Sequence, residues 1–212
     1  HQENSILFSS FCFSNCRKLS TVEVTCKSFK TSDNCFNSCD LLTSFKVETS
    51  EEVKLHQETF KGCHNLQEIS FNKSSKIDIE NDHFCWPENL KLVSFNEVKE
   101  VILGHHTFKN AKNLENILIT KSSQVIVGHE CFVSSFGLKN IEFITDSIFL
   151  GESFVCKCPS LQQVDIQCKN DIIIPINGFD QTNTIKSMSL KTQSSLVLPN
   201  NFLSDSTSLE KI

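Results

Sequence analysis

Phenylalanine recurs along this chain at nearly constant intervals, and this regularity restricts the possible folds more than any other feature of the sequence. Successive members of the series lie 23, 24, 24, 24, 24, 22, 25 and 23 residues apart; they are Phe13, Phe36, Phe60, Phe84, Phe108, Phe132, Phe154, Phe179 and Phe202. A unit of about 24 residues cannot bury its own apolar positions, so neighbouring units must stack. The spacing therefore predicts a solenoid.

Each phenylalanine is followed by an aliphatic anchor and then by two apolar residues that alternate with polar ones. The anchors are Leu19, Leu42, Leu66, Leu90, Leu114, Leu138, Leu161, Ile185 and Leu209. The alternating pairs are Val22/Val24, Phe45/Val47, Ile69/Phe71, Val93/Phe95, Ile117/Ile119, Ile141/Phe143, Val164/Ile166 and Met188/Leu190. Alternation with a period of two indicates a strand that buries one face.

A second, shorter alternation precedes most of the phenylalanines and predicts another strand in each unit. Its pairs are Val53/Leu55, Ile77/Ile79, Val101/Leu103, Val125/Val127 and Ile172/Ile174, whereas Phe29 has no clear partner. Between the two strands, the pattern Phe-x-x-small-x-x-Leu favours a single helical or 3₁₀ turn. The anchor follows seven residues after Phe154 and Phe202 instead of six, which predicts a one-residue bulge there.

The unit Phe60-Lys-Gly-Cys63-His-Asn-Leu66-Gln-Glu-Ile69-Ser-Phe71 resembles the BspA-like (Treponema pallidum type) leucine-rich repeat, and the resemblance extends over essentially the whole chain. Ile174-Pro175 and Leu198-Pro199 match the family's Ile-Pro step, although most units lack this proline and the family's alanine before phenylalanine. The resemblance implies a curved, right-handed leucine-rich-repeat solenoid, mainly β with short helical or 3₁₀ turns and about nine repeats of 22–25 residues. It also implies a cell-surface antigen used for adhesion.

Composition and motifs exclude several classes of function. The formal net charge is −5 and Arg17 is the single arginine, so the chain has no basic stripe for nucleic acid. No apolar run reaches the roughly 20 residues that cross a bilayer. Motifs for nucleophilic, phosphate-binding or metalloprotease chemistry are missing, which predicts neither enzymatic activity nor a cofactor. We expect residues 1–212 to be one solenoid segment of a longer protein.

Eleven cysteines occupy repeat positions that indicate a packing role. Cys16, Cys39 and Cys63 lie three residues after phenylalanine, at a position that Ala, Ser and Thr fill in other units, and Cys158 lies beside the bulge. We interpret this position as one that requires a small side chain. Cys12, Cys35 and Cys131 directly precede phenylalanine and receive the same interpretation. Disulfides between stacked neighbours such as Cys16 and Cys39 are the alternative. A structural zinc site is not expected, because Cys156-x-Cys158 lacks a second pair.

Histidines form one arrangement that could carry chemistry. Gly104-His105-His106 and Gly128-His129-Glu130 are in phase, so stacking would place His105 beside His129 and would align Asp82, His106 and Glu130. Side chains about 5 Å apart could share a metal or respond to pH. The alternative is structural, since an acid two residues before phenylalanine suits the start of a short helix.

The outward positions of the strand after each leucine provide a surface for binding. Most are polar, but Leu92, Leu118 and Ile144 form an apolar diagonal across three successive units, flanked by Ser94, Asn116 and Glu142. An apolar strip with a polar rim is typical of a protein-binding site. Asn72-Lys73-Ser74 is a possible glycosylation sequon at the end of a strand, where we expect it to be exposed.

These observations support three hypotheses of function. The first is a non-catalytic module at the cell surface that binds a protein or glycan through its strand-lined face. The second is an intracellular leucine-rich-repeat scaffold with reduced cysteines. The third is a metal-binding or pH-responsive protein that uses His105, His106 and His129.

Overall fold

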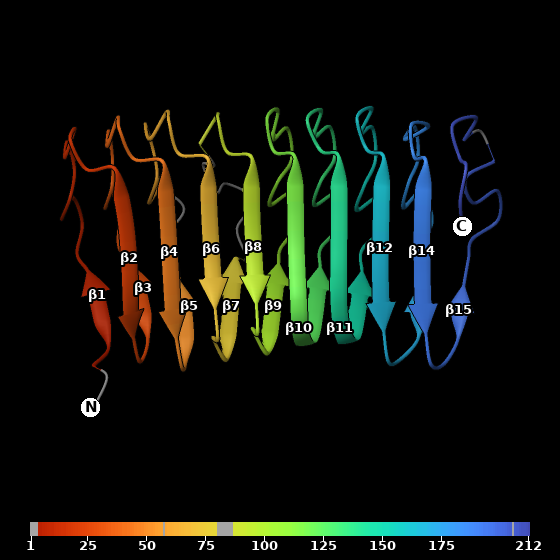
Figure 1. Cartoon of the computed structure of the whole chain (residues 1–212), viewed down its shortest axis with the longest axis horizontal. Coiled ribbons are helices and arrows are strands. Elements are labelled where there is room, and N and C mark those ends of the chain that lie inside the picture. Colours follow the sequence, from red (N-terminus) through yellow and green to blue (C-terminus); the bar gives the residue numbers. More distant parts are fainter. Residues whose placement is uncertain (1–3, 57, 80–86, 205) are drawn as a thin grey trace.

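The computed structural model describes residues 4–56, 58–79, 87–204 and 206–212, which wind into a parallel β-solenoid with two sheets (Figure 1). The strands after each leucine form the front sheet: β2 (Thr21–Cys26), β4 (Ser44–Thr49), β6 (Glu68–Asn72), β8 (Leu92–Asn96), β12 (Gln163–Cys168), β14 (Ser187–Thr192) and the first parts of β10 (Asn116–Val127) and β11 (Asn140–Leu150). The strands before each phenylalanine form the back sheet: β1 (Ile6–Phe8), β3 (Phe29–Thr31), β5 (Glu52–Lys54), β7 (Lys76–Ile79), β9 (Glu100–Leu103) and the second parts of β10 and β11. After β11, β13 (Ile172–Ile173) and β15 (Leu196–Val197) pair as a separate two-stranded sheet.

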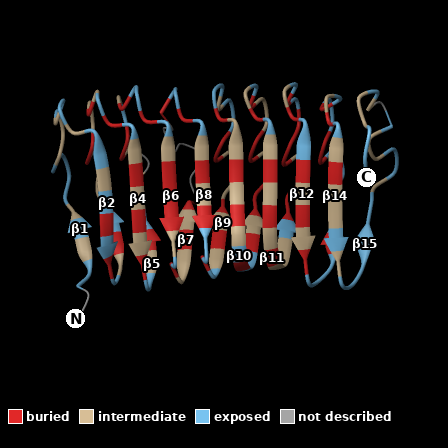
Figure 2. Ribbon diagram, in the orientation of Figure 1, coloured by how far each residue is buried: buried red, intermediate tan, exposed pale blue. Residues whose placement is uncertain are grey.

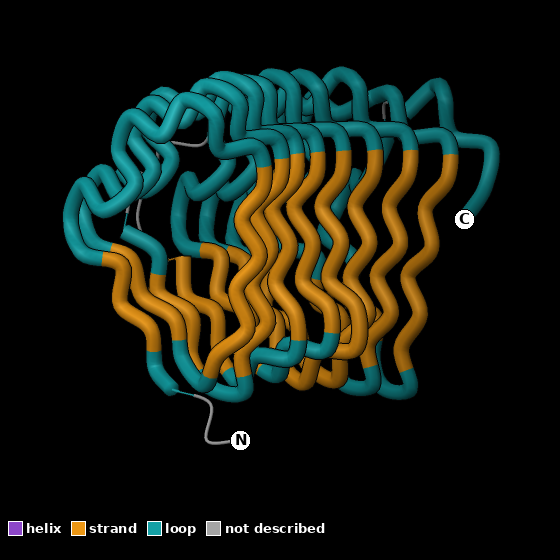
Figure 3. The backbone as a smooth tube through the Cα atoms, turned by 60° about the vertical axis from the view of Figure 1, so that its left-hand side comes forward, coloured by secondary structure: helices purple, strands orange, loops and turns teal. Residues whose placement is uncertain are grey.

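Strands of successive coils pair in parallel, in the register that the phenylalanine period predicts. In the front sheet, Val93 pairs with Ile117 and Ile117 with Ile141, and the same apolar column continues in both directions. β10 and β11 bend from one sheet into the other, which joins the two sheets at one edge (Figure 3). The described residues make about eight coils, and a single bridge between Ser187 and Lys211 begins the next strand. The solenoid that the spacing and the resemblance predicted is confirmed.

Phe29, which has no clear partner in the sequence, lies in a regular strand of the back sheet. It is fully buried and pairs with Ile6 on one side and Val53 on the other. The apolar alternation is hidden because the second inward position of β3 is Thr31. The hydroxyl of Thr31 is satisfied by that of Thr59, 2.6 Å away in the next coil. A polar residue can thus occupy the core column when the neighbouring coil supplies a partner.

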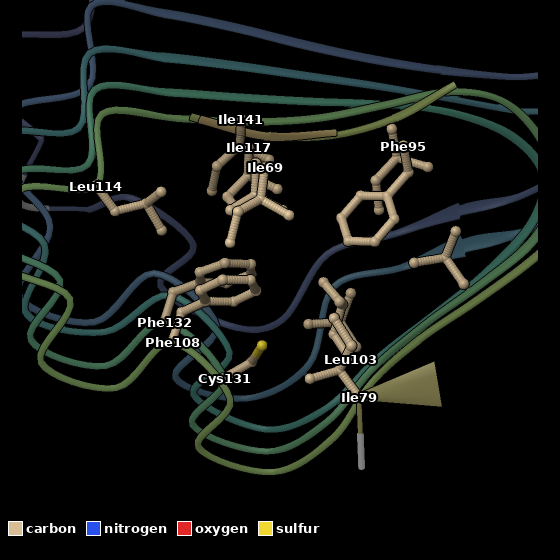
Figure 4. Close-up of a cluster of buried hydrophobic side chains, with 14 of the residues drawn as sticks. Ile69, Ile79, Phe95, Leu103, Phe108, Leu114, Ile117, Cys131, Phe132 and Ile141 are labelled. Atoms are coloured by element: carbon tan, nitrogen blue, oxygen red, sulfur yellow. The ribbon is translucent and has the colours of Figure 1, made fainter. Parts of the chain in front are cut away.

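The core lies between the two sheets and consists of columns of like side chains. Along the front strands, buried residues alternate with less buried ones (Figure 2). Phenylalanine rings stack in parallel from coil to coil, with 5.3 Å between the ring centres of Phe13 and Phe36 and 5.2 Å between those of Phe108 and Phe132 (Figure 4). From Phe154 to Phe179 and onwards the rings meet edge to face instead, where the repeat lengths change. Phe84 lies outside the described residues.

The helical or 3₁₀ turns predicted between the strands are absent from the described residues, and this expectation was wrong. A 3₁₀ turn needs consecutive residues with φ near −60°. In this turn, residues two before and two after phenylalanine are left-handed: φ is 58° at His106 and 62° at Asn110, on either side of Phe108. These left-handed residues turn alternate backbone amides toward the next coil, so Phe108 N donates to Cys131 O at 2.8 Å. Stacking, and not a local helix, satisfies this backbone.

Truncation of a ring in the core should cost far more than truncation of the same ring at the surface. Phe132 is fully buried in the phenylalanine column, whereas Phe136, four residues later, is 50% exposed. We expect Phe132→Ala to lower the free energy of unfolding by about 3–5 kcal/mol through the cavity it leaves. Urea denaturation measures this change, with Phe136→Ala as the matched control. Equal effects of the two substitutions would contradict the assignment of Phe132 to the core.

Candidate functional site

The front strip, which we define as Leu92, Leu118 and Ile144, faces outward from β8, β10 and β11. All three side chains are half-buried, because their neighbours in the sheet pack against them. Leu92 pairs with Asn116, Leu118 pairs with Ser94 and Glu142, and the three apolar residues therefore step diagonally across the strands. The structure thus brings together the residues that the sequence analysis selected, as a shallow apolar diagonal with a polar rim.

A hollow of about 280 Å³ adjoins the front strip at Ile144. Ile144 lines it, together with Gln167 of the next strand and the lysines Lys121, Lys169 and Lys191. Lys169 is engaged by Asp146 at 2.7 Å, and Lys121 by Glu97 at 2.8 Å. Ion pairs of this exposed kind are weak, so both ammonium groups could exchange partners when a ligand approaches.

A second apolar surface, on the outer face of the back sheet, was missed by the sequence analysis. Its residues stand between the two inward residues of each short strand; we call Ile102, Ile126, Phe149, Ile173 and Val197 the back strip. Phe149 and Ile173 are each 56% exposed, which is more than any residue of the front strip. Ile126, between Val125 and Val127, and Ile173, between Ile172 and Ile174, could have revealed the back strip. An isoleucine is unusual at these outward positions.

The in-phase histidines lie where stacking predicted them. The rings of His105 and His129 are parallel, 4.9 Å apart, and His106 Nε2 lies 3.1 Å from the carboxylate of Glu130. Lys109 also contacts this carboxylate, at 2.9 Å, and its ammonium is the main cause of a lowered pKa of Glu130. Glu130 has a φ of 52°, so it does not begin a helix. Asp82, the third member of the predicted column, lies outside the described residues.

The backbone occupies the nitrogen that a metal would need in both stacked histidines. His105 Nδ1 accepts the N–H of His129 at 3.0 Å, and His129 Nδ1 accepts the N–H of Glu152 at 3.1 Å. Within the described parts of the chain, no three His, Cys, Asp or Glu side chains converge as metal ligands. The arrangement serves to bind one coil to the next.

The cysteine position after phenylalanine supplies a hydrogen-bond donor in several coils, although Ala111 fills it without one. The sulfur of Cys63 donates to the carbonyl of Phe36 in the preceding coil at 3.0 Å, and Ser135 Oγ donates to the carbonyl of Phe108 at 2.6 Å. Cys39, Cys158 and Thr182 make the same kind of bond. The sequence reading recognised the small volume but not the shared donor; Cys, Ser and Thr at one position were the available signal.

Burial makes the core thiols poor nucleophiles. Desolvation raises the pKa of Cys35, Cys63 and Cys158 to about 12, so these thiols stay protonated near neutral pH. Cys16 and Cys39 are free, and so are the described cysteines Cys12, Cys35, Cys63, Cys131, Cys156, Cys158 and Cys168. Protonated thiols suit the donor role that the hydrogen bonds require.

Asn72 of the sequon ends β6 and is half-buried, whereas the sequence suggested an exposed position. Its partner Ser74 is 1% exposed, and the Ser74 hydroxyl donates to the carbonyl of Lys76 at 3.0 Å. The hydroxyl of the sequon is thus engaged within the coil. Glycosylation of Asn72 stays a prediction.

The fold and the repeated columns define a leucine-rich-repeat solenoid of the parallel β type. The model of the BspA type leucine rich repeat region matches residues 2–102 and 101–212, so the chain belongs to this family. No curated protein sequence matches the chain.

Two solved structures are similar to this chain. One is a leucine rich cell surface protein from Faecalibacterium prausnitzii A2-165, with a TM-score of 0.40 and 14% identity over 99% of this chain and 82% of that one. The other is the pneumococcal vaccine antigen PcpA, with a TM-score of 0.36 and 13% identity over 100% of this chain and 89% of that one. No helix in the described residues is long and apolar enough to cross a membrane.

The donor role of the position after phenylalanine can be tested at Ser135. Ser135→Ala keeps the small volume but removes the hydroxyl that donates to the carbonyl of Phe108. We expect it to lower the free energy of unfolding by about 1 kcal/mol, the usual net contribution of such a bond. Ser135→Cys, which keeps a donor, is the control and should lose less. Thermal and urea denaturation measure the stability of both variants. If Ser135→Ala were as stable as Ser135→Cys, or more stable, small side-chain volume would be the only property that this position needs.

Proposed function

We propose that this chain is a non-catalytic binding module, displayed at the cell surface, that adheres to a protein or glycan through the front sheet. The observation that carries the proposal is the front strip, an apolar diagonal on a sheet whose other outward residues are mostly polar. Membership of the leucine-rich-repeat family supports a role in binding. The surface location rests on the resemblance of the repeat unit to the BspA-like leucine-rich repeat.

The geometry of the front sheet suits recognition of a large partner. Its outward positions repeat in every coil and are held by continuous backbone pairing, so little order is lost when a ligand binds. Leu92, Leu118 and Ile144 would form the apolar centre, and Ser94, Asn116 and Glu142 the polar rim. The rim residue Asn116 keeps a fixed orientation toward the ligand, because its Oδ1 accepts a hydrogen bond from Asn140 Nδ2 at 2.7 Å.

Replacement of the central leucine by a charged residue should abolish this binding without unfolding the chain. Leu118 faces outward, so the carboxylate of Leu118→Glu can reach solvent in the free protein but must be desolvated in a complex. We expect at least a roughly 30-fold loss of affinity, as for a central interface residue. The measurement is binding of the chain to arrays of glycans and extracellular protein domains, followed by titration of the strongest saturable ligand.

Thr25→Glu is the matched control, because it adds the same charge at an exposed outward position in β2, far from the front strip. It should bind like the unmodified chain. A complete lack of saturable binding on both arrays would contradict the proposed function. Equal affinity of the Leu118→Glu and Thr25→Glu variants would instead exclude the front strip as the binding surface.

The thiol chemistry favours the intracellular scaffold as a second candidate. Cys39, Cys63 and Cys158 donate S–H bonds to backbone carbonyls, and such bonds require reduced cysteines. Reduced thiols are typical of intracellular proteins. This scaffold would use the same front strip for a regulatory partner.

Counting thiols distinguishes the two compartments. In protein isolated from its source cells without reductant, the scaffold hypothesis predicts that all eleven cysteines are alkylated by iodoacetamide after unfolding. Among the described cysteines of the native state, the accessible Cys12 and Cys16 should react rapidly at pH 8, whereas burial and a raised pKa protect Cys63 and Cys158. Mass spectrometry reads both patterns. Recovery of several disulfides would favour the surface hypothesis instead.

A further inference from the structure

The back strip is an apolar line in two parts, on a surface that begins as a charged one. Residue pairing places Lys30, Lys54 and Asp78 in the first coils of this column, followed by Ile102, Ile126 and Phe149; Ile173 and Val197 pair with each other in the separate two-stranded sheet that comes next. Phe149 and Ile173 are 56% exposed and Val197 is 49% exposed. Coils about 5 Å apart give the strip a length of roughly 20 Å. This length matches an extended peptide of about six residues.

A column of glycines forms a floor beside the back strip. A Cβ atom on Gly128 would lie 2.5 Å from the carbonyl carbon of Gly104, and one on Gly151 would lie 2.5 Å from His129 N. The backbones of neighbouring coils approach too closely for any side chain at these positions. The coils are therefore in direct backbone contact next to the apolar strip.

Histidine and glutamate residues border this floor on the side away from the strip. His105 and His129 stack in parallel at 4.9 Å, and each Nδ1 accepts a backbone N–H of the next coil. These hydrogen bonds fix the orientation of both imidazole rings, with Nδ1 of each ring as the acceptor. Glu152 continues the border in the next coil and is exposed. Strip, floor and border thus run side by side along the stack of coils.

A hollow of about 640 Å³ lies at the step from β11 to β13. Phe149, Ile173 and Pro175 give it apolar walls, and His129, Glu152 and Asp171 line it with polar groups. The volume lies in the range of sites that hold a large side chain or a small ligand. Among the described residues that line the hollow, none is a lysine or arginine.

Asp171 is held in a fixed, ionised state. Its carboxylate accepts hydrogen bonds from Ser194 Oγ at 2.5 Å and from the N–H of Ser195 at 3.0 Å, both in the next coil. These bonds hold the pKa of Asp171 below its usual value. The hollow thus contains two carboxylates, on Asp171 and Glu152, beside an exposed aromatic ring and without a lining basic side chain.

We propose that the hollow and the back strip bind an extended peptide segment of a partner protein, with an arginine or lysine in the hollow and apolar residues along the back strip. The cation would contact the carboxylates of Asp171 and Glu152 and the face of the Phe149 ring, and its methylene groups would pack on Ile173. The site lies on the opposite sheet from the front strip and does not depend on it.

Charge and shape favour this ligand over others. Phosphate backbones are repelled by two carboxylates without a compensating cation. A basic side chain, in contrast, supplies the missing charge and also covers the apolar walls. The long, narrow strip matches alternate side chains of an extended chain, which project on one side at every second residue.

Selection from a random decapeptide phage library tests the proposal without a known ligand. The library is panned on the intact chain and, in parallel, on a chain carrying Phe149→Ala and Asp171→Asn. Both positions are exposed, so these substitutions should leave the fold intact. We expect peptides that enrich only on the unmodified chain and that carry an arginine or lysine between apolar residues. No such enrichment, or a consensus without a cation, would overturn the proposal, as would Phe149-dependent binding to neutral oligosaccharides alone.

A selected peptide then tests the charge contact by fluorescence anisotropy. Asp171→Asn should weaken binding of the arginine peptide by about tenfold or more, as expected when a charge-assisted hydrogen bond is lost. It should leave a citrulline version of the peptide unaffected, because citrulline has the shape but not the charge. Lys54→Ala, in the charged part of the same column, is the control and should bind normally. Equal weakening of the arginine and citrulline peptides would contradict the proposed pairing.

Discussion

Hydrogen bonding between successive coils is the constraint on which the rest of this structure depends. Each coil satisfies its backbone with the coil before and the coil after it, in the strands and also in the turns, where Phe13 N donates to Cys35 O. Buried amides and carbonyls are costly without partners, so a one-residue shift of register between β10 and β11 is confined to a bulge between Ile119 and Ser122. The register then stacks like on like, which places phenylalanine on phenylalanine and thiol or hydroxyl donors above the carbonyls that they satisfy.

The same constraint determines how this protein presents a surface. An outward position recurs about every 5 Å along the stack, so a change of residue type from coil to coil changes the surface in small steps. The front sheet gains an apolar diagonal in its middle coils, and the back sheet changes from Lys54 and Asp78 to Ile102 and Phe149. Recognition can therefore evolve by single substitutions that do not disturb the core.

Most of the fold follows from the sequence because apolar periodicity records inward positions directly. Val93, Ile117 and Ile141 align as predicted, and so do His105 and His129. Three features could not be read in this way. The left-handed residues of the turns, such as Glu130, are with the exception of Gly62 not glycines, and they leave no pattern of hydrophobicity. The buried Thr31 breaks the alternation because its partner, Thr59, lies in another coil. The back strip depends on exposure, which periodicity alone does not give.

The most direct test of stacked coils is a nuclear Overhauser measurement on protein with labelled Val and Ile methyl groups. The register predicts contacts from the methyl groups of Ile117 to those of both Val93 and Ile141, in the two flanking strands. No contact should join Val93 to Ile141, which lie two strands apart. A spectrum without the Val93–Ile117 and Ile117–Ile141 contacts would contradict the parallel solenoid and every surface derived from it.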